Sequence, residues 1–430
     1  MRYKGNSLEL KNVQAMFSIL EQDMLSLWTS LMQGSQLHVN YKLIAEDLAN
    51  RHVGYSFLED PRNPFSTYRC TFAKHILNTA SLRSKFTRLQ GTKLIWKRSA
   101  LQAWLAEYSQ LSLLHLLRCE MLSGGPSRGT ELTAMMYRTG KGRSIRNLVA
   151  IGPHLVMLKA YAKTSAMMGS DRLIPHSLDG FEADLLVQDL VLARPFAEFA
   201  IKMCWPEDNT QLSVYQFHLF VKSGKLFSTT DLSNAMSKYT LKALQLRLTV
   251  HDWRHISIAW RRKLCPTHIE FMDEDETEDH IAAEQTGHTA HTERLKYAIS
   301  AEALAGPSED VLPLFLQASG KWQQEMKVVP GKSKMLIMQH ILTKIIGGLG
   351  LSFLDAQAIN YTSLVAEGKI QESAAKKLKT TAAALDIDTV ANAVVAKLLP
   401  IFTNMQAELG GLVKNAVENA FKAKSTIENK

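Results

Sequence analysis

The chain has 430 residues, 46% of them hydrophobic, and its 50 Lys and Arg against 41 Asp and Glu give a formal net charge of +9 and a pI near 9.2. These values argue against a disordered chain, suggest a globular protein of two or three domains, and favour a polyanionic partner. Four scattered cysteines without a C-x-x-C spacing argue against a zinc site or a disulfide framework and fit a reducing compartment.

We expect neither a secretory signal nor a membrane span. Residues 1–30 lack an apolar core followed by a small-residue cleavage site. The most apolar long window, residues 335–354, contains Gln339, His340 and Lys344 and is too polar to cross a bilayer comfortably. An intracellular protein without membrane association is therefore the expectation.

Helical periodicity characterises the first hundred residues. Apolar residues recur at helical spacing in residues 8–33, and residues 41–49 and 66–80 have a similar pattern. We predict that residues 1–105 form an all-helical domain.

That domain ends in a basic segment, residues 81–99, in which cations alternate with apolar side chains. The segment is either a solvated helix face or a surface that contacts phosphates. The predicted DNA-binding residues are Lys85, Arg88, Lys93, Lys97 and Arg98.

The middle of the chain changes from helix to strand and back. Residues 99–122 predict an apolar helix that stops at a Gly-Gly-Pro turn. Residues 144–164 are rich in β-branched and aromatic side chains around a Gly-Pro break, so we predict a hairpin, followed by a third strand in RLIPHSL, residues 172–178. Helices resume near Leu185, with an acidic loop at residues 270–280.

Residues 306–430 contain Gly-Pro punctuation and an Ala-rich helical stripe, so we predict a helical C-terminal extension. The expected fold is mainly α with a small antiparallel β-sheet, an α+β class. Its three predicted domains are residues 1–105 (helical, DNA-clamping), 106–305 (catalytic) and 306–430.

The spacing H-x-x-R occurs three times, and context distinguishes the three copies. His115 lies in the apolar helix, where a packing or surface role is expected, and His291 lies in a polar stretch where ion pairing is expected. The copy in HDWRH places His251 and Arg254 one turn apart at a helix start. We therefore take His251 and Arg254 as the functional pair.

Two further motifs flank this pair. Upstream, GGPSRGTELTAM brings Arg128 to a helix start with Glu131 one turn later, and downstream QTGHTAHTERLKYAI contains Gly287, His288 and Tyr297. In this order and spacing the motifs resemble the catalytic domain of tyrosine recombinases, the integrase family, over residues 120–300. Among them, the recombinases of eukaryotic mobile elements such as Crypton transposons are the most similar in character.

The resemblance implies that Arg128 and Arg254 clamp the scissile phosphate, which suits a planar guanidinium that remains charged at working pH. It implies a lysine on the hairpin as the general acid, here Lys163, with Lys159 as the fallback because alternation places both on one strand face. Glu131 would brace the first arginine.

The resemblance further implies that His251 acts as a base or proton shuttle and that His288 donates a hydrogen bond to the phosphate. Tyr297 would be the nucleophile, leaving a 3′-phosphotyrosyl link and a free 5′-hydroxyl. Such chemistry conserves the bond energy, so we expect no metal, ATP or other cofactor.

The implied function is site-specific DNA recombination, which would serve DNA integration or transposon movement. The implied partners are double-stranded DNA and a homo-tetramer on two sites, a dimer per site, in the nucleus if eukaryotic and otherwise in the cytoplasm with the DNA. Alternatives are a type IB topoisomerase, against which His251 argues, and a DNA-binding protein with a vestigial site. The long gap between Arg254 and His288 and the long tail depart from the family pattern.

Overall fold

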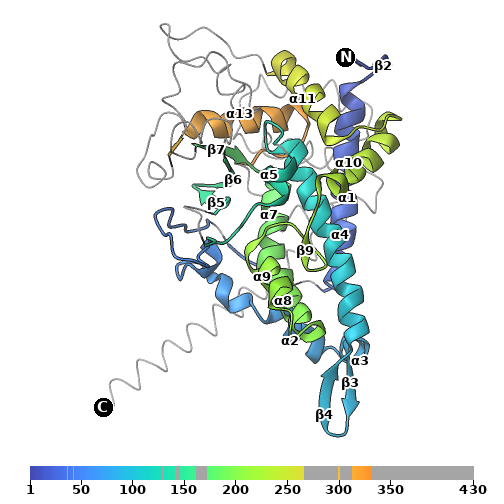
Figure 1. Ribbon diagram of the computed structural model, residues 1–430, viewed down its shortest axis with the longest axis vertical. Coiled ribbons are helices and arrows are strands. Elements are labelled where there is room, and N and C mark those ends of the chain that lie inside the picture. Colours follow the sequence, from blue (N-terminus) through green and yellow to red (C-terminus); the bar gives the residue numbers. More distant parts are fainter. Residues whose placement is uncertain are drawn as a thin grey trace, which may run out of the picture. The chain divides into compact units, whose positions relative to one another are not determined.

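The computed structural model describes residues 1–35, 37–41, 43–127, 129–141, 146–160, 172–265, 299–300 and 312–331, with backbone alone at residues 160, 172, 173, 299 and 300 (Figure 1). The chain divides into two compact units, Met1–Ile337 and Met338–Lys430. All the described residues belong to the first unit.

Helices make up most of the first unit. The α-helices are α1 (Leu10–Leu31), α2 (Thr71–Asn78), α3 (Ala80–Phe86), α4 (Arg98–Leu122), α5 (Gly129–Thr133), α7 (Gly180–Gln188), α8 (Arg194–Cys204), α9 (Asn209–Phe217), α10 (Thr229–Leu244), α11 (Val250–Leu264) and α13 (Leu312–Glu325). Short 3-10 helices span Phe57–Glu59 and Pro64–Tyr68, and a π-helical stretch, Asp189–Ala193, joins α7 to α8.

The strands form small antiparallel sheets. β1 (Arg2–Tyr3) pairs with β2 (Asn6–Ser7), β3 (Thr87–Gln90) with β4 (Lys93–Trp96), and β8 (Val221–Lys222) with β9 (Lys225–Leu226). The fourth sheet has the order β10-β7-β6-β5, formed by β5 (Leu148–Ile151), β6 (His154–Ala160), β7 (Arg172–Ser177) and β10 (Ile299–Ser300). The predicted α+β class, mainly helical with small antiparallel sheets, is confirmed.

Helix α1 confirms the helix predicted in residues 8–33. Val13, Phe17, Leu20 and Met24 lie on one face of α1 and are buried, as the helical repeat requires. This face packs against α4 and α10. One hydrophobic core therefore contains residues from the first hundred positions and from the centre of the chain.

The expectation that the first hundred residues form helices alone is wrong. Described residues 43–49 contain no helix. Residues 66–80 are largely helical, as predicted, because they contain the end of a 3-10 helix, α2 and the first residue of α3. The basic segment, predicted as a possible helix face, is instead α3 followed by the β3–β4 hairpin. Alternation with period two along this segment suits a strand, and Gly91 adopts a positive φ of 61° at the turn.

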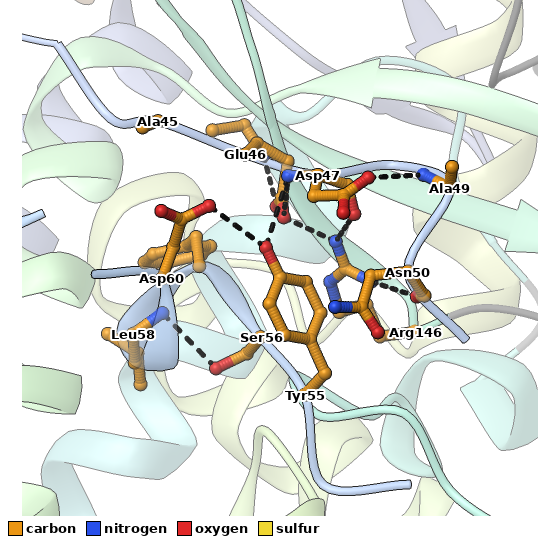
Figure 2. A network of polar contacts seen from close by, with 12 residues as sticks. Ala45, Glu46, Asp47, Ala49, Asn50, Tyr55, Ser56, Leu58, Asp60 and Arg146 are labelled. Carbon is orange, nitrogen blue, oxygen red and sulfur yellow. Dashed lines mark hydrogen bonds and ion pairs between the residues drawn. The ribbon is translucent and has the colours of Figure 1, made fainter. Parts of the chain in front are cut away.

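A polar network fastens the loop after residue 43 to the sheet (Figure 2). The fully buried Arg146 donates from Nη2 to the Glu46 carboxylate and, at 3.1 Å, to the carbonyl of Asp47. The other Glu46 oxygen accepts from the amide of Ala150 in β5 at 3.2 Å, and the Arg146 guanidinium lies 4.7 Å from the Tyr55 ring centroid. The network thereby pairs the buried Arg146 with the buried Glu46, because an unpaired charge inside a protein is costly.

The hairpin and third strand predicted in residues 144–178 are confirmed as β5, β6 and β7. The predicted apolar helix at residues 99–122 is confirmed as α4, which runs unbroken across the predicted boundary at residues 105 and 106. Beyond the predicted boundary at residue 305, α13 packs against β7, and the Trp322 indole N–H donates to the carbonyl of Met121 at 3.0 Å.

Within the described part of the chain, no helix is both long and apolar enough to cross a membrane.

Candidate active site

The candidate site begins at the turn between α4 and α5. The helix ends at Leu122, and the amide of Ser127 donates to Glu120 Oε2 at 3.2 Å, so a carboxylate from the last turn of α4 holds the turn. A Cβ on Gly129 would lie 2.7 Å from Thr229 Cγ2, so only glycine lets the start of α5 approach α10 this closely. Arg128, between Ser127 and Gly129, lies outside the described residues.

Lys159, on β6, reaches this turn from the sheet. Its side chain is buried, and Nζ donates to the carbonyl of Gly125 at 3.2 Å and to Ser123 Oγ at 3.4 Å. Both acceptors are neutral oxygens. Burial lowers the pKa of Lys159 to about 8, against the opposing field of Glu120.

Glu120 is the carboxylate that acts most strongly on the charge of Lys159. Burial raises its pKa to about 7, while the fields of Lys159 and Arg254 and the hydrogen bond from Ser127 oppose the rise. Glu131 in α5 raises the pKa of both Glu120 and Lys159 through its negative charge. The predicted residues Arg254 and Glu131 therefore lie within electrostatic reach of one carboxylate, together with the fallback lysine.

Two further buried bases complete this group. Burial lowers the pKa of Arg261 on α11 to about 10. Burial, with the nearby charges of Lys159 and Arg261, holds the pKa of His176 on β7 well below its usual range, so His176 is neutral at pH 7. We call Glu120, Lys159, His176, Arg254 and Arg261 the Lys159 cluster.

The Lys159 cluster has unsatisfied hydrogen-bonding capacity. Among the described residues, Glu120 Oε1, Ser127 Oγ and His176 Nδ1 are buried and make no hydrogen bond.

Helix α11 carries the HDWRH motif in a well-defined start. Thr249 and Asp252 form a reciprocal capping box. Tyr3 Oη and Lys4 Nζ also donate to Asp252, at 2.9 and 2.7 Å. Although burial opposes it, these hydrogen bonds hold the pKa of Asp252 below its usual range. The predicted helix start is confirmed, and the chain's N-terminal hairpin braces it.

His251 and Arg254 occupy different environments on this helix. His251 is exposed and its Nε2 lies 3.2 Å from Nε2 of His255, also exposed. Arg254 is half-buried one turn later, and its positive charge acts on Glu120 of the Lys159 cluster. The arginine is thus partly shielded and acts on Glu120, whereas the histidine is exposed to solvent.

Lys163, His288 and Tyr297 lie, like Arg128, outside the described residues. Tyr297 stands two positions before β10, whose Ile299 and Ser300 pair with Leu173 and Arg172 of β7. The backbone that follows Tyr297 therefore joins the same sheet as Lys159 and His176.

The H-x-x-R copy in α4 has a structural role. His115 is buried with Nδ1 2.8 Å from Glu182 Oε1. Arg118 is fully buried and donates to both oxygens of Asp179 at 2.7 to 3.2 Å and to Glu21 at 3.2 Å. We call Arg118, Asp179 and Glu21 the Arg118 cluster; the prediction that His115 packs rather than reacts agrees with this geometry.

The predicted DNA-binding cations surround the β3–β4 hairpin. Lys85, Arg88, Lys93 and Arg98 are exposed and Lys97 is half-buried. Lys85 donates to Gln33 Oε1 and Lys97 to the carbonyl of Ser84, both at 2.6 Å. The two lysines at the base are thus held, whereas Arg88 and Lys93 lie on the hairpin itself.

The sequence interpretation missed Glu120, His176 and Arg261. A signal existed for Glu120, because a carboxylate inside the apolar run of residues 111–122 must be paired or functional. No comparable signal existed for His176 or Arg261, whose neighbours come from distant parts of the chain.

Comparison with known proteins found no family model that matches this chain and no solved structure with significant similarity to it.

Proposed function

We propose that the protein is a site-specific DNA recombinase that cuts and rejoins DNA through a 3′-phosphotyrosyl intermediate, with strand exchange between two duplexes bound by a tetramer. One observation carries the proposal. The charges of Arg254 and Glu131, chosen from separate motifs, both act on Glu120, and Glu120 also interacts electrostatically with Lys159, the buried hairpin lysine that donates to the turn leading into Arg128.

A phosphodiester resists nucleophiles because its oxygens are anionic, so the enzyme must hold positive charge beside those oxygens. Arg128 and Arg254 supply this charge as the clamp on the non-bridging oxygens. Glu120 and Glu131 limit the local positive excess and orient the cations. The half-buried position of Arg254 suits this role, because a guanidinium that is partly exposed and acts on Glu120 remains accessible to a phosphate that arrives from solvent.

Tyr297 attacks the phosphorus, His251 accepts the proton of the tyrosine, and the 5′-oxygen leaves after protonation by a lysine. We assign this protonation to Lys163. Lys159 is already engaged by Gly125 and Ser123, so it is a positioning residue that fixes the turn before Arg128. His288 donates a hydrogen bond to the phosphate.

The first experiment tests the nucleophile. The full chain, incubated with DNA to which it binds and which carries a nick that traps cleavage, should form a protein–DNA adduct that resists SDS. Tyr297→Phe should abolish the adduct. Tyr239→Phe is the matched control, because its hydroxyl donates to Asp23 at 2.8 Å in a structural contact and its loss should leave the adduct intact.

Further variants separate chemistry from binding. Arg254→Ala should remove the adduct while retaining most of the DNA affinity. An adduct that persists in Tyr297→Phe would overturn the assigned nucleophile, and tight DNA binding without any adduct in the wild-type chain would indicate a vestigial site.

The general acid can be identified with a modified leaving group. A substrate with sulfur at the bridging 5′ position releases a thiolate, which needs no proton because thiols are far more acidic than alcohols. Lys163→Ala should cleave this substrate nearly as fast as the wild type, whereas Lys159→Ala should remain slow on both substrates. The reverse result would make Lys159 the acid.

A further inference from the structure

The positive charge of the chain is concentrated in one segment. Residues 61–106 contain nine Lys and Arg and not one Asp or Glu. The rest of the chain therefore holds 41 basic and 41 acidic residues, so the whole formal excess of +9 belongs to this segment. An excess gathered in 46 residues produces a local field that a net charge spread over the whole surface would not.

Most of this charge surrounds the β3–β4 hairpin, whose two faces differ. Leu89 is paired directly with Leu94, and Thr87 with Trp96. Because side chains alternate along a strand, these four share one face. Arg88 and Lys93 belong to the opposite face.

The apolar face extends from the core to solvent. At its base the Trp96 ring lies 5.0 Å from the ring of Phe199 and 5.9 Å from that of Phe196. Toward the tip Leu89 is 73% exposed and Leu94 44% exposed. A cross-strand leucine pair that faces water costs solvation free energy, so a partner that covers it would stabilise it.

The base of the hairpin is firmly held. The amide of Lys97 donates to the carbonyl of Phe86 at 2.7 Å, and Phe86 is buried with its ring 6.1 Å from that of Phe196. In Figure 1 the hairpin extends beyond α3 and the N-terminal end of α4. It is therefore a projecting element on a rigid base, which is what insertion into a partner requires.

We propose that the β3–β4 hairpin enters the minor groove of duplex DNA, where Leu89 and Leu94 wedge against a base step and Arg88 and Lys93 contact the flanking phosphates. Apolar wedges of this kind unstack a step and bend the duplex, which widens the groove. The inference takes the DNA of the proposed recombinase as its partner, but it concerns binding and shape, which do not depend on cleavage.

Charge and size favour DNA over a lipid surface. Two leucine side chains bury fewer carbons than a single myristoyl chain, which itself gives only marginal membrane binding. Strands of DNA-binding proteins enter either groove, and an exposed leucine pair favours the minor groove, where apolar side chains wedge between base steps and open the groove by bending the duplex.

The charged face is tested by the salt dependence of affinity for a mixed-sequence duplex, measured by fluorescence anisotropy with the full chain. Arg88→Gln with Lys93→Gln should reduce the slope of log K against log salt by about 2, since each lost phosphate contact removes about one unit. The matched control is Lys222→Gln with Lys225→Gln, two paired lysines on the β8–β9 hairpin, which should leave the slope unchanged. Equal slopes for both double variants would overturn the proposal.

The role of the apolar face is tested by measuring how much the protein bends a DNA duplex. With dyes at the two duplex ends, wild-type protein should raise energy transfer, and Leu89→Ser with Leu94→Ser should lose this rise while the salt slope persists. Leu43→Ser with Val53→Ser, also exposed, should keep it. A minor-groove ligand such as distamycin should compete with the wild type.

Other outcomes separate the proposals from one another. If the leucine variant lost binding to phosphatidylserine vesicles but bent DNA normally, a lipid surface would replace DNA as the partner. If wild-type protein formed no adduct but the hairpin variants showed the expected losses, the inference would stand and the proposed recombinase activity would fail. If adduct formation was normal but both hairpin variants bound and bent DNA like wild type, only the hairpin inference would fail.

Discussion

The two buried charge clusters differ in how their cations are neutralised. Arg118 is bonded directly to Asp179 and Glu21, at 2.7 to 3.2 Å. Burial alone would lower the pKa of Arg118, but the two carboxylates keep it above its usual value. Lys159 instead donates to a hydroxyl and a carbonyl, and burial lowers its pKa to about 8.

The contrast distinguishes structure from chemistry. A cation locked by two carboxylates stays charged and joins elements, here α1, α4 and the start of α7. A cation held by neutral oxygens near its protonation equilibrium responds to a new anion, because an arriving phosphate would favour its charged form. Such perturbed groups gather at functional sites.

The largest effect is expected from breaking the Arg118 cluster. Arg118→Met leaves two buried carboxylates without their cation, although Asp179 still accepts from the Glu182 amide, and should lower the free energy of unfolding by about 3–5 kcal/mol. Urea denaturation of the full chain measures it. Lys11→Met, which removes an exposed lysine from its pair with the exposed Glu9, is the control and should change stability little. If Arg118→Met lost as little stability as the control, the structural role assigned to the Arg118 cluster would be wrong.

Lys159→Met should have a smaller effect on stability. Methionine fills a similar volume, and the lost bonds are to neutral oxygens, so the cost should be less than about 2 kcal/mol. Glu120 then becomes protonated more readily because it loses a nearby positive charge. Adduct formation should nevertheless fall by at least about tenfold, since misplacing a catalytic turn is costly. Stability lost as in Arg118→Met, with adduct formation intact, would make Lys159 purely structural.

Local patterns predicted the fold well where one periodicity ran for several turns. Helices α1 and α4 and the β5–β6–β7 strands follow from apolar spacing and β-branched residues. The β3–β4 hairpin was missed because each strand has four residues, too few to separate period two from the helical pattern beside it. Residues 43–49 have apolar positions at helical spacing but are held as a loop by the Arg146 network, which no local pattern reveals.

Sequence motifs predicted some residues of the candidate site but not the environments of its buried bases. Arg254 and Glu131 came from ordered motifs, and the charges of both act on Glu120. The environment of Lys159, however, depends on a turn more than thirty residues upstream, and that of His176 depends on Lys159 and Arg261. Burial by distant segments sets their pKa values, so the sequence could prefer Lys163 to Lys159 only by its place on the hairpin and not by its environment.

The smallest expected effect is on the pH dependence of stability, and it tests whether the Arg118 and Lys159 clusters act independently. Burial raises the pKa of Glu120 from 4.5 to about 7, and that of Glu21 in the Arg118 cluster likewise to about 7. Between pH 4.5 and 7 the folded chain therefore binds more protons than the unfolded chain at each group, so each makes stability fall as pH rises through this window.

Glu120→Gln and Glu21→Gln should each flatten this fall, measured as the free energy of unfolding at several pH values. Only Glu120→Gln should also shift the pH dependence of adduct formation, because Glu120 acts on Lys159 and Arg254 whereas Glu21 acts on Arg118. If both variants shifted that profile equally, the two clusters would be coupled through α4 and the division between a structural and a chemical cluster would not hold.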